Sequence, residues 1–275
     1  MKLTLPFLET MLTQVCNLSC VGCTNYSDMT HTGYVTWQQG RAELEPWLER
    51  ITIPDFGLMG GEPLINPEYR EWIYGCRELM PDSQLRFTTN GELLHKATDI
   101  FDVLYDVGNI VFKITVHKDS PELEEHIKDI FSKYFWETVT EWGITRYKSR
   151  NNVRFQINRP KTFVKSFRGN YENMMPYNSN PRDSFDICCQ QTCPLLYQGK
   201  IYKCSTSGLL KEVLTKTGNI NRADWQDYIV DGIGPSDDVE SFIRGFGRPE
   251  AICRMCPTSA DPDAQIEHKI NVTRK

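Results

Sequence analysis

Short apolar runs alternate with longer amphipathic stretches from residue 8 to about residue 168. This alternation is typical of repeated strand–helix units that build a parallel sheet. The chain is therefore expected to adopt an α/β fold. The apolar runs predict strands at residues 8–13, 56–60, 85–90, 109–116 and 153–158, with a sixth strand at 162–167.

Helices are expected between these strands. Apolar residues there recur at steps of three and four, as at Ile127, Ile130 and Phe131. Asn66 and Ser120 each precede a proline, and a capping residue followed by proline marks a helix start. The predicted helices cover residues 37–50, 67–79, 95–106 and 120–142.

The pattern changes after about residue 168, where Asn, Pro, Ser and Cys become frequent. The segment LLYQGKIYKCS predicts two short strands joined at Gln198-Gly199. No internal repeat or low-complexity tract is visible. We place the boundary between residues 168 and 187, and predict a β–α domain over residues 1–170 and a cysteine-rich domain over residues 171–275.

Composition restricts the class of protein. Hydrophobic residues make up 40% of the 275 positions and charged residues 24%, as in globular domains. The net charge of -5, without dense Lys/Arg clusters, argues against a nucleic-acid partner. No apolar run approaches the roughly 20 residues that span a bilayer, and the N-terminus does not resemble a signal peptide. We expect a cytoplasmic protein without a membrane partner.

Ten cysteines are many for a protein of a reducing compartment, where they favour metal binding or catalysis over disulfides. Cys16, Cys20 and Cys23 stand together, and Cys76 is isolated and is interpreted as a packing residue. The other six occur in the last third of the chain. Two metal centres are therefore predicted.

The first group has the spacing C-x3-C-x2-C and follows the first predicted strand. Three thiolates in one loop can hold three irons of a [4Fe–4S] cube and leave the fourth iron open for chemistry. A zinc knuckle is the alternative for the triplet taken alone. Two further motifs decide between them.

Gly60-Gly61-Glu62-Pro63 follows the second predicted strand, and Thr88-Thr89-Asn90-Gly91 ends the third. Either segment alone would be interpreted as an ordinary turn. In this order after the triplet, they resemble the GGEP and TNG motifs of the radical S-adenosylmethionine (SAM) superfamily. The resemblance implies that SAM binds the open iron, that the reduced cluster cleaves SAM to a 5′-deoxyadenosyl radical, and that the GGEP residues contact the amino group of SAM. It assigns cofactor binding to Gly60, Gly61, Glu62, Pro63, Thr89 and Asn90.

Residues on the later strands are weaker candidates for contacts with SAM. Lys113, Thr115 and His117 alternate to one face of the fourth strand, and Gln156 lies on the fifth. The resemblance assigns SAM contacts to Thr115, His117 and Gln156, whereas a half-solvated strand is the competing interpretation.

One position departs from the family pattern. Most members carry an aromatic residue directly before the last cysteine of the triplet, and this chain has Gly22. Tyr26 is the candidate replacement.

The C-terminal cysteines resemble the auxiliary-cluster region of the twitch and SPASM subfamilies. Gly199 and Cys204 have the expected spacing, and Cys253 and Cys256 form the later pair. A complete SPASM domain needs more cysteines, so one auxiliary [4Fe–4S] cluster in a twitch-like domain is expected, and a zinc site is the alternative. Four of six cysteines would bind it, among Cys188, Cys189, Cys193, Cys204, Cys253 and Cys256.

The predicted architecture is a partial (βα)6 TIM-like barrel followed by a small cysteine-rich, twitch-like domain. In such barrels chemistry occurs at the carboxyl ends of the strands, where Cys16, Gly60 and Asn90 all fall.

Three function classes remain open. The favoured one is a radical SAM enzyme that modifies a ribosomally made peptide or protein. The alternatives are an enzyme that oxidises or rearranges a small metabolite, such as a sugar alcohol or a nucleoside, and a non-catalytic metal-binding protein. No general base is assigned, although His117 and Glu62 are candidates.

Partners follow from the same resemblance. An electron donor such as flavodoxin or ferredoxin is expected. Little sequence precedes the first predicted strand, so no fused peptide-recognition domain is expected. This weakens the case for a peptide substrate without excluding it, because such a domain can be a separate protein. Three aromatic residues between the domains are candidates for substrate contacts or for packing, namely Tyr171, Tyr177 and Phe185.

Overall fold

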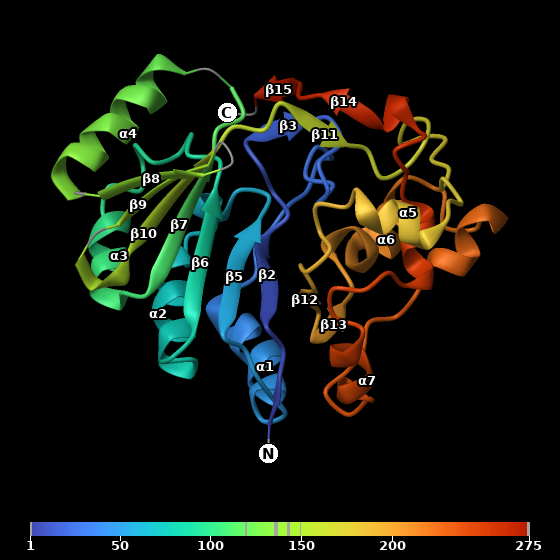
Figure 1. Ribbon diagram of the computed structural model, residues 1–275, viewed down its shortest axis with the longest axis horizontal. Coiled ribbons are helices and arrows are strands. Elements are labelled where there is room, and N and C mark those ends of the chain that lie inside the picture. The colour runs from blue at the N-terminus through green and yellow to red at the C-terminus, as the bar shows by residue number, and fades with distance from the viewer. Residues whose placement is uncertain (1, 119, 135–136, 142–143, 149, 274–275) are drawn as a thin grey trace.

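A nine-stranded sheet forms the centre of the structure, a computed structural model that describes residues 2–118, 120–134, 137–141, 144–148 and 150–273 (Figure 1). Its strands lie in the order β13-β12-β2-β5-β6-β7-β10-β9-β8. The five strands that the sequence predicted with helices between them are confirmed and run parallel. They are β2 (Phe7–Thr13), β5 (Asp55–Gly60), β6 (Gln84–Thr89), β7 (Ile110–Thr115) and β10 (Arg154–Asn158).

The helices α1 (Trp37–Leu48), α2 (Tyr69–Leu79), α3 (Ile100–Val107) and α4 (Pro121–Tyr134) follow successive strands, as predicted. Helix α1 begins at a capping box between Thr36 and Gln39. The fourth predicted helix is wrong beyond residue 134, because β8 (Glu137–Glu141) and β9 (Ile144–Lys148) form an antiparallel pair there. Threonine, valine and isoleucine are frequent in this pair, and branched side chains favour strands.

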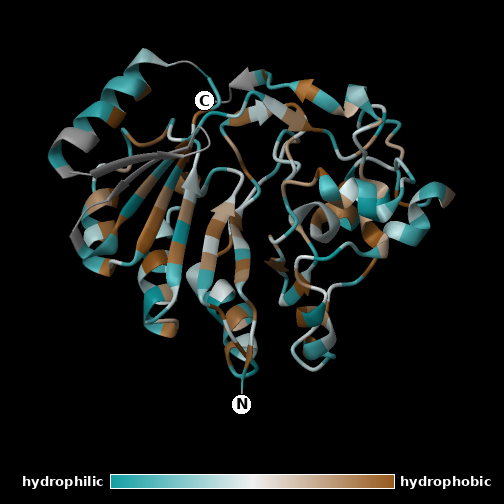
Figure 2. Ribbon diagram, viewed as in Figure 1, coloured by the Kyte–Doolittle hydropathy of each residue, from teal (hydrophilic) through white to brown (hydrophobic). Residues whose placement is uncertain are grey.

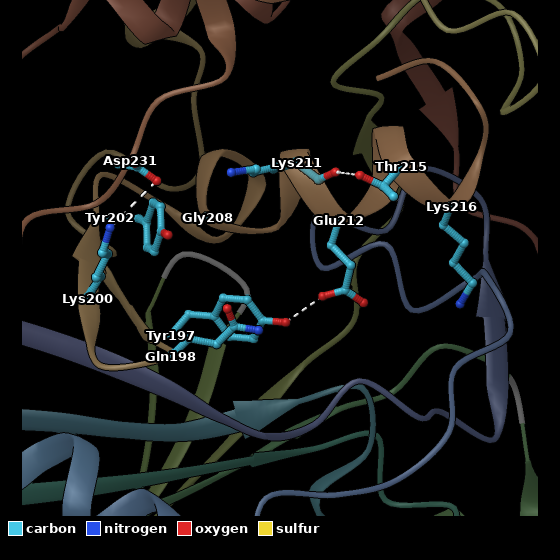
Figure 3. A pocket seen from close by; sticks show the side chains of 10 residues that line it. All are labelled: Tyr197, Gln198, Lys200, Tyr202, Gly208, Lys211, Glu212, Thr215, Lys216 and Asp231. Atoms are coloured by element: carbon cyan, nitrogen blue, oxygen red, sulfur yellow. Dashed lines mark hydrogen bonds and ion pairs between the residues drawn. The ribbon is translucent and has the colours of Figure 1, made fainter. Parts of the chain in front are cut away.

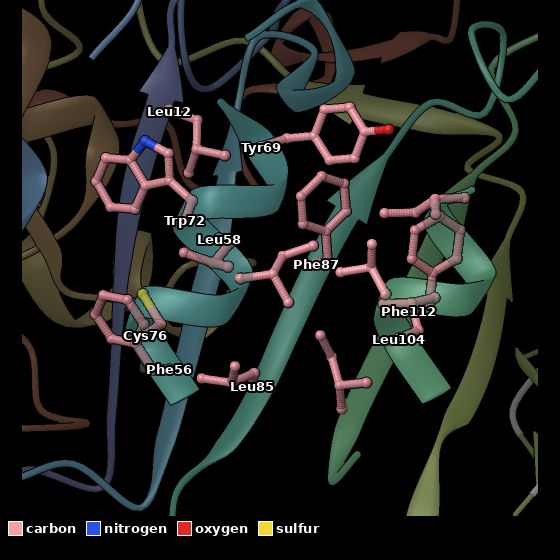
Figure 4. Packing of buried hydrophobic residues seen from close by; sticks show 14 of the residues in the cluster. Leu12, Phe56, Leu58, Tyr69, Trp72, Cys76, Leu85, Phe87, Leu104 and Phe112 are labelled. Carbon is pink, nitrogen blue, oxygen red and sulfur yellow. The ribbon is translucent and has the colours of Figure 1, made fainter. Parts of the chain in front are cut away.

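The core lies between the sheet and these helices. Alternate strand residues such as Phe56, Phe87 and Phe112 are fully buried and belong to one apolar cluster with Trp72 (Figure 4). Cys76 is buried among them, which confirms its interpretation as a packing residue. Burying a large apolar side chain stabilises the fold by about 1.5–3 kcal/mol. The intervening strand residues face the opposite side of the sheet, and Figure 2 shows hydrophobic and hydrophilic colours on the same strands.

The sixth strand was placed wrongly. Residues Thr162–Val164 form β11, which pairs antiparallel with β14 (Gln265–Glu267) outside the main sheet. The sixth parallel strand is β12 (Leu195–Tyr197), which lies beside β2. A strand inside a sheet is covered on both faces; Leu195 and Leu196 are buried, whereas the residues of β11 are half-buried or exposed.

The predicted hairpin is confirmed. Strand β12 turns at Gln198 and Gly199, whose φ angles of 51° and 73° suit a two-residue turn, into β13 (Lys200–Tyr202). These strands come from the predicted cysteine-rich domain and extend the sheet of the predicted barrel. The fold is therefore α/β with a mainly parallel sheet, like a partial barrel.

The C-terminal part has its own apolar cluster, which includes Leu209, Leu214 and Trp225. It contains the helices α5 (Pro181–Asp186), α6 (Ser205–Lys216) and α7 (Val239–Arg244). Two short antiparallel pairs, β11 with β14 and β3 (Leu18–Cys20) with β15 (Ile270–Thr273), cross above the carboxyl ends of the parallel strands (Figure 1).

The remaining short elements are β1 (Leu3–Thr4) paired with β4 (Ile51–Thr52) and several single turns of 3-10 helix. Among the described residues, no helix combines the length and apolar character that crossing a bilayer requires.

Candidate active site

The triplet loop leaves the carboxyl end of β2 and contains three free thiols. Cys16 and Cys20 are buried, and Cys23 is partly buried. The backbone N–H of Leu18 lies 3.4 Å from Sγ of Cys16 and donates to it. On the other side, the N–H of Val21 donates to the carbonyl of Lys269 at 3.0 Å, so the C-terminal segment holds the loop in place.

Burial governs the protonation of these thiols. It raises the pKa of Cys16 to about 12 and also raises the pKa values of Cys20 and Cys23. Without metal the three groups are thiols at pH 7. Because iron binds the thiolate, loading a cluster would release their protons.

The two glycines of the GGEP segment lie directly against the strand that leads into this loop. The N–H of Gly61 donates to the carbonyl of Thr13 at 2.7 Å, and the N–H of Glu62 donates to that of Val15 at 2.8 Å. A Cβ atom on Gly60 or Gly61 would lie 2.2 Å from the carbonyl oxygen of Thr13 or Val15. Glycine is therefore required for this close backbone packing.

The carboxyl group of Glu62 joins the GGEP and TNG segments. It is fully buried, and its Oε1 accepts from the hydroxyl of Thr89 at 2.7 Å and from the N–H of Leu64 at 3.0 Å. Its Oε2 accepts from the N–H of Asn90 at 2.7 Å. Burial raises the pKa of Glu62 to about 7, and the three hydrogen bonds oppose that rise. Pro63, which starts the following turn, is also buried.

Asn90 extends this connection to the cysteines. Its Nδ2 donates to Oδ1 of Asn17 at 2.7 Å and lies 3.8 Å from Sγ of Cys16. Residues from the three motifs thus meet at one edge of the sheet, as the resemblance required.

An unpartnered acceptor beside the GGEP segment offers a place for a cation. Nδ2 of Asn25 donates to the carbonyl of Gly60 at 3.0 Å, whereas its Oδ1 is buried and has no hydrogen-bond partner in the described part of the chain. A buried amide oxygen is costly when unpaired. The ammonium group of SAM would satisfy it, so the residues present fit this cofactor.

Apolar side chains fill the space beside Gly22, whose φ is +76°. A Cβ atom there would lie 3.0 Å from Ile266 and 3.6 Å from Phe163. Tyr26, the candidate replacement for the missing aromatic residue, packs instead against Phe167, with ring centroids 6.4 Å apart. The neighbours of Gly22 come from β11 and β14.

Two histidines lie at the same edge. Nδ1 of His117 and Nε2 of His268 are 3.1 Å apart, and ligand atoms of both residues lie within 4.8 Å of one another and of Cys20. Burial and the neighbouring His268 lower the pKa of His117 to about 4, so this ring is neutral at pH 7. The remaining predicted SAM contacts, Thr115 and Gln156, are half-buried on β7 and β10.

Four C-terminal cysteines line one small cavity, namely Cys188, Cys204, Cys253 and Cys256. The N–H groups of Gln190 and Glu250 already donate to Sγ of Cys188 at 3.2 Å and of Cys253 at 3.5 Å. Burial raises the pKa of Cys256 well above its usual value, and the nearby Cys204 adds to that rise. Cys189 and Cys193 do not line this cavity.

A larger surface cavity of about 560 Å³ lies between α6 and the β12–β13 hairpin (Figure 3). Its lining includes Tyr197, Lys211 and Glu212, and no cysteine contributes to it. Glu212 accepts from Tyr197 and, at 3.2 Å, from Nε2 of Gln14. Because none of the predicted site residues lines this cavity, we do not place the active site there.

The amino-acid sequence supports the assignment that this geometry suggests. Residues 10–143 match the sequence profile described as the radical SAM superfamily. The chain belongs to the radical SAM superfamily. Members of this superfamily are enzymes that use a [4Fe–4S] cluster and SAM.

Individual relatives cover only part of the protein. A GTP 3′,8-cyclase from Microcystis aeruginosa is 30% identical over 129 residues, which are 45% of this chain and 38% of that protein. A GTP 3′,8-cyclase from Trichormus variabilis is 28% identical over 139 residues, or 48% and 41% of the two chains. The match thus spans about two fifths of the length of these relatives.

A solved radical SAM structure extends the likeness of fold to most of the chain. BtrN, crystallised in complex with AdoMet and 2-DOIA, superposes with a TM-score of 0.51 over 94% of this chain and 95% of its own. The identity is 14%, so this comparison concerns the fold alone.

Four residues of the site were not recognised from the sequence. Asn17 and Asn25 lie within or directly after the triplet, where a search for amides flanking the cysteines would have found them. Phe163 and His268 reach the loop only through the pairing of β11 with β14, and no local pattern announces that contact.

Proposed function

We propose that this chain holds a [4Fe–4S] cluster on Cys16, Cys20 and Cys23, cleaves SAM reductively, and removes a hydrogen atom from a substrate with the 5′-deoxyadenosyl radical. The observation that carries the proposal is the convergence of three free thiols with the contact between Glu62 and Asn90 at one sheet edge. When bound, the cluster supplies the electron that cleaves SAM. A reduced flavodoxin or ferredoxin is the proposed electron donor.

The protein's own residues orient the cofactor. The carbonyl of Gly60 and the unpartnered Oδ1 of Asn25 offer two acceptors for the ammonium group of SAM. The carboxyl oxygens of Glu62 already accept three hydrogen bonds. Glu62 therefore contributes by holding the backbone of Asn90 in place and not by binding SAM directly. Thr115 and Gln156 face the same side of the sheet as candidate contacts.

A second [4Fe–4S] cluster is proposed at Cys188, Cys204, Cys253 and Cys256, which makes the C-terminal part a twitch-like domain. The support is that these four thiols line one cavity, with two N–H groups already directed at their sulfur atoms. Hydrogen bonds to sulfur are a common feature of iron–sulfur sites. Four cysteines also suit zinc, so metal analysis must accompany the assignment.

We propose a small polar molecule as the substrate. The support is the similarity to proteins named for their action on GTP, which is a small molecule. The peptide substrate that the sequence analysis favoured is the second candidate, and its support is the twitch- or SPASM-like cysteine pattern. A separate peptide-recognition protein is proposed as a partner only under that alternative.

The test of SAM cleavage is anaerobic. The protein is reconstituted with iron and sulfide, supplied with SAM and dithionite, and analysed for 5′-deoxyadenosine by mass spectrometry. Cys16→Ala is the variant, and Glu45→Ala, at an exposed position on α1, is the control. Product from the wild type and the control but not from Cys16→Ala supports the proposal, and equal amounts from all three proteins contradict it.

The two substrate classes are separated by size. Lysate is divided by a filter into small molecules and macromolecules, and each fraction is added to the reconstituted protein. Faster formation of 5′-deoxyadenosine with the filtrate favours a small substrate, and faster formation with the retained fraction favours a peptide or protein.

A further inference from the structure

The inner face of the sheet, defined here as the face opposite α1, α2 and α3, carries polar side chains in successive rows. The row nearest the amino ends of the strands is internally paired. Arg86 forms an ion pair with Asp55, and its Nε donates to Oδ1 of Asp55 at 2.6 Å. Gln84 donates to the same carboxyl group at 3.0 Å, and Arg154 donates to Gln84. These four side chains are thus bonded to one another.

The next row toward the carboxyl ends is different. Thr88 on β6 is the register partner of Lys113 on β7, and Lys113 is the register partner of Gln156 on β10. Glu9 on β2 lies one step lower by register, level with Gly57 on β5 and Arg86 on β6, but it is close enough for the Lys113 ammonium to act on its carboxyl group. We call Glu9, Thr88, Lys113 and Gln156 the middle layer.

The middle layer is polar, half-buried and unpaired. Within the described residues, none of its four side chains forms a hydrogen bond or an ion pair. Burial raises the pKa of the Glu9 carboxyl group to about 8 against the opposing effect of Lys113. Polar groups removed from water are costly unless something satisfies them, and the paired row directly below shows that this sheet can satisfy its own polar groups.

The segment around Pro194, which precedes β12, lies over the same layer. The N–H of Glu9 donates to the carbonyl of Pro194 at 3.0 Å, which fastens this segment to β2. Lys113 lowers and Glu9 raises the pKa of the Cys193 thiol, so all three groups are close. Lys113 also lowers and Glu9 also raises the pKa of the Cys189 thiol. The two cysteines outside the four-cysteine cavity therefore border the middle layer.

The middle layer also lies just below the SAM site. Met59 follows Leu58 on β5, directly before Gly60, and its sulfur contacts Nδ2 of Asn25 at 3.5 Å. Thr88 precedes Thr89, the partner of Glu62. A molecule on the middle layer would lie between the paired row and the residues that orient SAM.

We propose that Glu9 and Lys113 contact the substrate, and that they select a small polyhydroxylated metabolite, whose hydroxyl groups both donate to a carboxyl group and accept from an ammonium group. This inference rests on the proposed function and adds to it the substrate class and two residues that bind it. Thr88 and Gln156 supply further hydrogen bonds from the neighbouring strands.

Transfer of deuterium tests this assignment. Small molecules are prepared from cells grown on heavy water and deuterated carbon source, dried, and redissolved in ordinary water so that only carbon-bound deuterium remains. The reconstituted holoenzyme with SAM and dithionite is given this filtrate, and deuterium in 5′-deoxyadenosine is measured by mass spectrometry. A deuterated fraction of large molecules is assayed in parallel.

The variants are Glu9→Gln and Lys113→Met. Their matched controls are Glu122→Gln and Lys161→Met, at two exposed residues that are not part of the middle layer. Iron content and the circular dichroism spectrum establish that each protein is folded and loaded.

The inference predicts deuterated 5′-deoxyadenosine from the wild type and both controls with the small-molecule filtrate, and a labelled fraction at least about 10-fold lower in both variants. Labelling within twofold of wild type in either variant overturns it, as does labelling from large molecules only or from neither fraction. Absence of 5′-deoxyadenosine from the loaded wild type is a separate result, because it means that the proposed SAM cleavage itself has failed.

Discussion

Oε2 of Glu62 accepts a hydrogen bond from the backbone N–H of Asn90 at 2.7 Å, across a separation of 28 residues in the chain. Through this contact the end of β5 determines where the end of β6 lies. Because Nδ2 of Asn90 in turn donates to Asn17 in the cluster loop, the three sequence motifs form one connected unit. Removing the carboxyl group should therefore disturb the whole unit.

Glu62→Ala tests that connection. The substitution leaves three buried donors without an acceptor, so the free energy of unfolding should fall by about 1–3 kcal/mol. Affinity for SAM, measured by equilibrium dialysis with the reconstituted protein, should fall as well because Asn90 loses its anchor. Glu45→Ala, on the exposed side of α1, is the control and should change neither quantity. An unchanged affinity for SAM in Glu62→Ala would contradict the positioning role.

Gly61→Ala should displace the cluster loop. The added Cβ would lie 2.2 Å from the carbonyl oxygen of Val15, which precedes Cys16, and such overpacking costs about 1–3 kcal/mol. We expect less iron at the SAM cluster after reconstitution, measured by iron analysis and by absorbance of the cluster. Gly234→Ala is the control, since its Cβ would meet only the side chain of Asp237 at 3.5 Å. Equal iron in the two variants would argue against close packing as the reason for this glycine.

The fold could be predicted from the sequence wherever one strand residue in two packs against helices. The apolar alternation in β5, β6 and β7 is a local signal, and their positions were correct. Strand β12 was predicted as part of the hairpin, but its place beside β2 was not. That pairing leaves no local signal, because the two strands lie far apart in the chain and the hydroxyl of Thr10 donates to the carbonyl of Leu196 across 186 positions. The β8–β9 pair was missed because helical spacing of apolar residues runs up to its start.

The residues of the site likewise fall into those that the sequence reveals and those that only the folded structure reveals. Cys16, Glu62 and Asn90 belong to motifs that can be read along the chain. His268 could not be foreseen, since it reaches His117 only through the pairing of C-terminal strands with β11 and β3. Sequence spacing left the auxiliary ligands ambiguous among six cysteines. We propose Cys188, Cys204, Cys253 and Cys256 because these four line one cavity.

That selection can be checked by counting iron. Wild type with two [4Fe–4S] clusters should hold about 8 iron atoms, and Cys204→Ser or Cys256→Ser should hold about 4. Cys189→Ser and Cys193→Ser should match the wild type, because neither residue lines the cavity. Zinc in place of the missing iron, or a loss in Cys193→Ser equal to that in Cys204→Ser, would show that the ligand assignment is wrong.

The pH dependence of stability should reveal the buried state of Glu9. Burial raises its pKa from 4.5 to about 8, so the folded protein holds this proton more tightly than the unfolded chain does. The resulting stabilisation is complete below pH 4.5 and is lost as the pH rises through 8. The melting temperature of the wild type should therefore decrease relative to Glu9→Gln between pH 5 and pH 8. Parallel curves for the two proteins would mean that Glu9 is solvated.

The most direct test of the central claim is electron paramagnetic resonance of the reduced cluster in Cys204→Ser, where only the cluster on Cys16, Cys20 and Cys23 should remain. Addition of SAM should change the spectrum, because three cysteine ligands leave one iron of this cluster without a protein ligand and available to SAM. An identical spectrum with and without SAM, from a fully loaded cluster, would contradict that claim.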